Sequence, residues 1–122
     1  MPRQIQAVTF LVPWPPAKLN PNARTHWAVK ARAAASYRKA CSLLALQAKG
    51  RSSLHGPLRL SLEFLPPDAR RRDDDNLLAA FKSGRDGIAD ALKIDDSQFR
   101  TEFFIGPKTK GGAVRVTFEH IG

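Results

Sequence analysis

Apolar and polar residues alternate along several short stretches of the chain, as they do in β-strands with one buried face. The clearest stretch is 58–64, where every second side chain is leucine or phenylalanine. Residues 113–120 alternate in the same way, and residues 99–105 also predict a strand. Residues 5–12 form an apolar, β-branched run that the proline-rich segment 13–16 ends. The pattern therefore predicts four strands.

Two other stretches repeat apolar residues every three or four positions, as amphipathic helices do. Residues 27–49 predict the first helix, with Thr25 as its N-cap. The side chains expected on its buried face are Tyr37, Cys41, Leu44 and Ala48. Residues 76–92 predict the second helix. Gly84 and Gly87 would weaken it by about 1 kcal/mol each relative to alanine, so a bend or break is expected there if anywhere.

The order β-α-β-α-β-β predicts an α+β fold with a mixed, mostly antiparallel four-stranded sheet and two helices packed on it. Residues 106–112 are rich in glycine and lysine and would join the last two strands as a hairpin. A chain of 122 residues suits a single domain over residues 1–122. No apolar run approaches the roughly 20 residues of a membrane span, and no signal-peptide pattern opens the chain. These features predict a soluble, cytoplasmic protein without a membrane partner.

Charge is unevenly distributed along the chain. Lys and Arg number 20 against 11 Asp and Glu, which gives a formal net charge of +9. The first 62 residues contain no acid, whereas eight of the 11 acids lie between Asp68 and Asp96. The excess of positive charge favours a polyanionic partner but does not separate DNA, RNA and anionic lipid. The lone Cys41 excludes an internal disulfide and is expected in the core.

Three arginines directly precede three aspartates in residues 70–75, and the pair Asp95-Asp96 follows the second predicted helix. Adjacent carboxylates raise one another's pKa, so a fold that keeps them ionised needs a helix N-terminus, arginines or a metal ion. Capping of a helix explains one or two of these acids, but it does not explain a pair at the far end, where acid opposes the helix dipole.

Hard oxygen ligands on a loop and a distant turn suit Mg²⁺. A calcium loop is excluded, because the run that begins at Asp73 lacks the glycine and the glutamate that such a loop has at its sixth and twelfth positions. Mg²⁺ supports phosphodiester hydrolysis. Two alternatives stay open: a nucleic-acid binder without catalysis, and an acidic turn that is merely solvated.

Two lysines have both a functional and an ordinary interpretation. On a continuous helix Lys82 would share a face with Asp75 and Asp86. It could neutralise charge that builds up on a phosphorane or leaving group, or it could simply pair with Asp86 four residues on. Lys18 lies in a loop rich in Asn and Pro, which is either a solvated connector or a loop that contacts phosphate.

Four elements, in this order along the chain, resemble the RusA family of Holliday junction resolvases. They are Pro13-Trp14-Pro15-Pro16, Arg72-Asp73-Asp74-Asp75-Asn76-Leu77, Ile94-Asp95-Asp96-Ser97-Gln98 and Lys110-Gly111-Gly112. The resemblance implies a homodimeric, Mg²⁺-dependent endodeoxyribonuclease. Mn²⁺ could substitute for Mg²⁺. Such an enzyme makes paired cuts across branched DNA, the four-way junctions of recombination and repair.

The resemblance also implies a set of site residues. Asp73, Asp75 and Asp96 would hold the metal, with Asp95 as the next candidate. The family has a lysine three residues after the asparagine, where this chain has Ala79. An insertion between the two acidic elements would place Lys82 in that catalytic role. The candidates for contacting DNA phosphates are Lys18, Arg70, Arg71 and Arg72. The alternative is a basic nucleic-acid-binding module whose acids only cap and order a loop.

Overall fold

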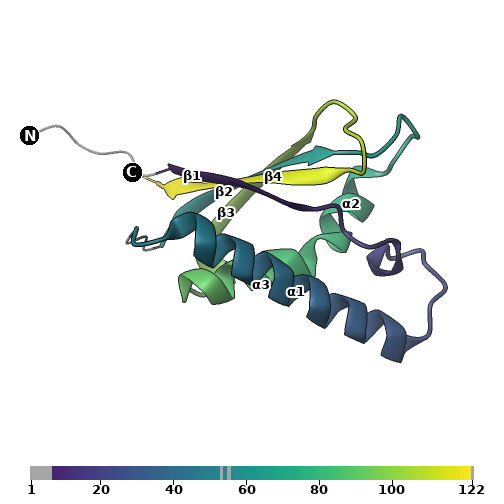
Figure 1. Ribbon diagram of the computed structural model, residues 1–122, viewed down its shortest axis with the longest axis horizontal. Coiled ribbons are helices and arrows are strands. Elements are labelled where there is room, and N and C mark those ends of the chain that lie inside the picture. Colours follow the sequence, from purple (N-terminus) through teal and green to yellow (C-terminus); the bar gives the residue numbers. More distant parts are fainter. Residues whose placement is uncertain (1–6, 53, 55, 122) are drawn as a thin grey trace, which may run out of the picture.

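The computed structural model describes residues 7–52, 54 and 56–121. Its elements are β1 (Ala7–Pro13), the 3-10 helix η1 (Ala17–Leu19), α1 (Trp27–Lys49), β2 (Leu58–Leu65), α2 (Asp74–Ala80), α3 (Lys82–Leu92), the 3-10 helix η2 (Asp96–Gln98), β3 (Phe99–Ile105) and β4 (Ala113–His120). Figure 1 shows the strands in one sheet, with α1 and α3 side by side against one of its faces. The predicted α+β class is confirmed, with three α-helices in the described residues instead of two. The first two residues of the predicted first strand lie outside the described residues.

The four strands are ordered β1-β4-β2-β3, with β2 and β3 parallel and the other neighbours antiparallel. The predicted hairpin between the last two strands is therefore wrong, because β4 inserts between β1 and β2. Phe118 of β4 pairs with Val8 on one side and with Leu60 on the other. A glycine-rich turn indicates that the chain reverses, but it does not decide which strand becomes the neighbour.

The core lies between the sheet and the helix layer. The inward side chains of β2 are fully buried, as the alternating pattern predicted. Phe64 at its end contacts the rings of Phe81 and Trp14 edge to face, at centroid distances of 6.0 and 6.1 Å. Burial raises the pKa of the Cys41 thiol to about 11, so this core cysteine stays protonated at neutral pH.

The first helix begins and ends at the predicted residues, but its N-cap is His26 and not Thr25. The Nδ1 atom of His26 accepts a hydrogen bond of 3.1 Å from the backbone N–H of Ala28. An imidazole nitrogen thus fulfils the role that a threonine hydroxyl was expected to fill. None of the described helices combines the length and the apolar character that crossing a membrane requires.

The second predicted helix is broken into α2 and α3 at Phe81, not at either glycine. The Phe81 side chain is fully buried, and its N–H is shared between the carbonyl oxygens of Leu77 (3.1 Å) and Leu78 (3.2 Å). Gly87 has a role in helix packing instead. A Cβ atom at Gly87 would lie 2.1 Å from the carbonyl oxygen of Arg38 on α1, so glycine permits the close approach of α3 to α1.

Candidate functional site

Three of the four sequence elements leave the sheet at the same end. Pro13 at the end of β1 pairs with Ala113 at the start of β4, which also pairs with Leu65 at the end of β2. The proline loop, the arginine and aspartate run and the glycine turn extend from these three positions. Residues almost 100 positions apart in the sequence therefore meet at one edge of the sheet.

Arg72 connects the proline loop to the arginine run at this end of the sheet. Its guanidinium lies over the Trp14 ring at 5.5 Å and donates to Asp68 Oδ1 at 2.8 Å. It also donates to the backbone oxygens of Asp68 and Arg70, at 3.1 and 2.9 Å. Hydrogen bonds from the Arg70 N–H and from the Arg72 side chain hold the pKa of Asp68 at about 2. With 16% of its side chain exposed, Arg72 orders the loop, a role that sequence reasoning missed.

The glycine turn packs against the proline loop and against the segment that follows β2. Gly112 has a φ of +71°, and a Cβ atom there would lie 3.0 Å from the Trp14 Cβ and 3.1 Å from the Pro67 Cδ. The N–H of Thr109 donates to the carbonyl oxygen of Pro66 at 2.8 Å. Glycine is required there both by the left-handed backbone and by the close contact with tryptophan.

A pocket of about 470 Å³ separates the proline loop from the arginine run. Arg70, Arg71 and Asp73 lie on one wall, and the other wall is formed by the proline loop and the residues after it. Arg70 pairs with Asp68 at 3.3 Å, whereas Arg71 is exposed and has no partner among the described residues. Lys18 is exposed on η1, next to Ala17 of the opposite wall. The pocket is thus open to an anion that Arg71 can reach.

The three consecutive aspartates do not have the same role. Asp73 caps α2, because its Oδ1 accepts hydrogen bonds from the N–H groups of Asp75 (2.8 Å) and Asn76 (3.3 Å). The expected capping role therefore accounts for one of the three acids. The carboxylates of Asp74 and Asp75 are exposed and have no partner in the part of the chain that the structure describes. Two acids next to the arginine-lined pocket remain available for an external ligand.

Asp96 lies away from this cluster. Helix η2 leads into Phe99, which pairs with Leu58 at the start of β2, while the aspartate run follows the end of β2. Because a strand rises about 3.3 Å per residue, the two ends of β2 are roughly 23 Å apart. Figure 1 places α2 near one end of the sheet and the turn after α3 toward the other.

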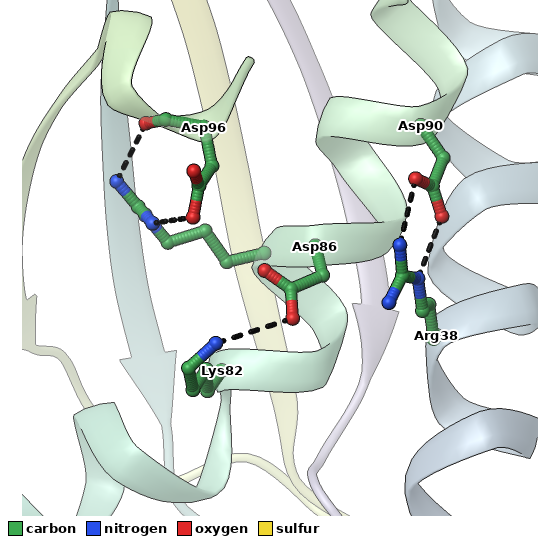
Figure 2. Close-up of polar contacts among 6 residues, drawn as sticks. Arg38, Lys82, Asp86, Asp90 and Asp96 are labelled. Carbon is green, nitrogen blue, oxygen red and sulfur yellow. Dashed lines mark hydrogen bonds and ion pairs between the residues drawn. The ribbon is translucent and has the colours of Figure 1, made fainter. Parts of the chain in front are cut away.

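Arg85 of α3 holds Asp96 in place. It donates from Nη1 to Asp96 Oδ2 at 3.2 Å and from Nη2 to the Asp96 carbonyl oxygen at 3.1 Å. Figure 2 draws both contacts as dashed lines at Asp96. Its Nε donates to Thr101 at 3.0 Å, and the guanidinium lies 5.4 Å from the Phe99 ring centre. No helix spacing rule relates Arg85 to a residue 11 positions later, so the sequence carried no signal for this contact. Asp95 is held separately by the Ser97 N–H, which lowers the pKa of its carboxyl.

Lys82 pairs with Asp86 at 3.4 Å, as Figure 2 shows. This is the ordinary i,i+4 contact that the sequence left open as an alternative. Ala79, Lys82 and Asp86 line one groove, but Asp75 is not among its lining residues, and α2 and α3 are separate helices that meet at Phe81. The predicted continuous face is therefore wrong, and the catalytic role of Lys82 stays a prediction.

The donor set suits magnesium, but a single chain does not assemble it. In the described residues no three Asp, Glu, His or Cys side chains come together as a metal site. Asp73, Asp75 and Asp96 therefore stay a predicted ligand set. Mg²⁺ is bound in proteins by one or two carboxylates together with water and substrate phosphates. The exposed carboxylate of Asp75, which has no partner among the described residues, fits that requirement.

A basic α+β domain with exposed acids beside an arginine-lined pocket has features expected of proteins that act on nucleic-acid phosphates. The family model described as "Endodeoxyribonuclease RusA" matches residues 13–119. The chain therefore belongs to the RusA endodeoxyribonuclease family, whose members are nucleases. An "Uncharacterized protein" of Xylella fastidiosa (strain Temecula1 / ATCC 700964) is 41% identical over 124 residues, which cover 98% of this chain and 79% of that protein.

Proposed function

We propose that this chain is an Mg²⁺-dependent, structure-specific endodeoxyribonuclease that resolves Holliday junctions by paired phosphodiester hydrolysis in recombination and repair. The observation that carries the proposal is the pair of exposed carboxylates, Asp74 and Asp75, which have no partner among the described residues and lie beside the exposed Arg71 in a chain of net charge +9. Family membership over residues 13–119 supports the same reaction. Acids exposed next to a polyanion would repel it unless a cation lies between them.

The residues at this end of the sheet have different roles in the proposed reaction. Arg71 and Lys18 contact the DNA phosphates, and Arg72 holds the loop that carries Arg71. Asp73 and Asp75 provide oxygen ligands for the metal ion. When bound, Mg²⁺ supplies polarisation of a phosphodiester oxygen and a water of lowered pKa.

We also propose that the enzyme is a homodimer and that Asp96 completes the site of the partner subunit. Paired cuts require two sites, and a two-fold symmetric dimer provides them. Within one chain Asp96 is held by Arg85, apart from Asp73 and Asp75. A second copy can bring its own Asp96 to the aspartate run of the first, which the fold of a single chain does not do.

The wild-type protein is expected to cut a four-way junction at paired, symmetric positions when Mg²⁺ is added, and to leave a linear duplex of the same sequence intact. Denaturing gels of junctions labelled on each strand in turn measure this. Chelation of the metal should stop cleavage but leave junction binding, because the phosphate contacts persist. Binding without cleavage in Mg²⁺ and in Mn²⁺ would support the alternative, a basic binding module whose acids only cap and order a loop.

Two neighbouring arginines are expected to differ in what they contribute. Arg71→Ala should weaken junction binding and lower the slope of log K against log salt by about 1, because one phosphate contact is lost. Its thermal stability should match wild type. Arg72→Ala should instead lower the free energy of unfolding by about 2 kcal/mol, since its hydrogen bonds involve a charged group and its side chain is mostly buried. Salt titrations and urea unfolding of both variants separate the two roles, and equal losses of stability would contradict them.

A further inference from the structure

A second groove, distinct from the arginine-lined pocket, lies between the start of α1 and the junction of α2 with α3. It encloses about 450 Å³, within the roughly 300–1,000 Å³ of ligand pockets. Alanines of α1 and α2 form much of its wall, and α3 contributes Ser83 beside them. Its charged residues are Lys30, Lys82 and Asp86, and Trp27 lies at one side.

Trp27 is unusual in its exposure. At 76% exposed it is the most accessible of the large apolar side chains in the described residues. The His26 ring stacks on it at 5.6 Å with an interplanar angle of 28°. His26 is itself fixed by its capping bond to the Ala28 N–H. An indole that is supported by a second ring but still largely exposed offers a flat apolar surface to a ligand.

The charge around the groove indicates which ligand fits. Helix α1 has no acid in its sequence, so the charge of Lys30 is not compensated on its own helix, while Lys82 is paired with Asp86. A nucleobase has flat faces that stack on an aromatic ring, and its phosphate meets a lysine.

We propose that Trp27 stacks on an unpaired base of the bound DNA, with Lys30 close to the phosphate of that nucleotide. The inference rests on the proposed function in one respect, namely that a branched junction supplies bases free of their own stack. Stacking on an aromatic side chain does not depend on base identity, because every base has a π-face. The contact would therefore favour branched over fully paired DNA without specifying sequence.

The test compares Trp27→Ala and Trp27→Phe with wild type for binding to a four-way junction, to single-stranded oligothymidylate and to a paired duplex, all in chelator. Trp27→Ala is expected to bind the junction and the single strand about tenfold more weakly, and the duplex with unchanged affinity. Trp27→Phe should keep most of the affinity. Leu43→Ala is the matched control, because Leu43 is also exposed on α1 but lies outside the groove.

Fluorescence provides an independent measurement. Oligothymidylate should quench the emission of wild type but not that of Trp27→Phe, which keeps the partly buried Trp14. Unchanged junction and single-strand affinities in Trp27→Ala would overturn the stacking contact, as would an equal loss on duplex. A change in sedimentation of Trp27→Ala would also overturn it and assign the groove to a subunit contact. A wild type that cuts no junction would refute the proposed function, while the oligothymidylate measurements still decide the role of Trp27.

Discussion

Two inactive variants, Asp75→Asn and Asp96→Asn, are expected to regain cleavage when they form one dimer. Each variant alone should cut junctions at least about 1,000-fold more slowly, because each removes a carboxylate from both metal sites. In the mixed dimer, one site combines the intact Asp75 of one subunit with the intact Asp96 of the other. The second site lacks both residues. Co-expression with two different tags and purification through both gives pure mixed dimers, with about half the wild-type number of active sites.

The expected product is a single nick where wild type makes paired cuts, which gels of junctions labelled on each strand distinguish. A mixed dimer of Asp73→Asn and Asp75→Asn is the matched control. It should stay inactive, since each of its sites retains one defective aspartate run. Recovery in the control, or an inactive Asp75→Asn and Asp96→Asn dimer that still binds junctions, would contradict a site shared between subunits.

A second control uses another aspartate bound by an arginine. Asp90 accepts from Arg38 at 2.7 and 2.9 Å on the other side of α3, as Figure 2 shows, and this contact lowers the pKa of its carboxyl. The geometry resembles that of Asp96 with Arg85, but Asp90 joins two helices and is not a predicted ligand. Asp90→Asn should therefore leave cleavage unchanged, whereas Asp96→Asn removes it.

The sequence predicted the elements better than their arrangement. Alternation along residues 58–64 and 113–120 reports which side chains face the core, because successive side chains point to opposite faces. It contains nothing about which strand lies beside which. β4 is central because it pairs with β1 on one side and with β2 on the other. Its Val114, Val116 and Phe118 are completely buried. Only long-range contacts could have revealed that arrangement.

The candidate site residues stay a prediction, and local sequence limits them for a similar reason. The acids and arginines were identified from their charge, and the family motifs placed Asp73, Asp75 and Asp96 in one site. Local sequence shows that Asp73 precedes a helix, and it does cap one. It does not show that Arg72 folds back on Trp14 or that Arg85 reaches Asp96, since both contacts depend on the tertiary structure.

Gly87→Ala is expected to lower the free energy of unfolding by about 1–3 kcal/mol, although alanine is the better helix former by about 1 kcal/mol. The added Cβ would lie 2.1 Å from the carbonyl oxygen of Arg38. This neighbour is backbone and cannot rotate away, so α1 and α3 must move apart and lose packing along their interface. Urea unfolding followed by circular dichroism measures the change. The slope of the free energy of unfolding against urea concentration should stay the same.

Two further variants of α3 separate the clash from the alanine itself. At Gly84 the neighbours of an added Cβ are the side chains of Tyr37, Phe81 and Cys41 at 2.8–3.1 Å, so Gly84→Ala should cost less than Gly87→Ala. Ser83→Ala adds no atom and removes a buried hydroxyl that has no hydrogen-bond partner within the described structure. It should be neutral or slightly stabilising, because alanine has the higher helix propensity and the hydroxyl is not satisfied. If Gly87→Ala were as stable as Ser83→Ala, the two helices would separate without cost, and close packing could not explain the glycine.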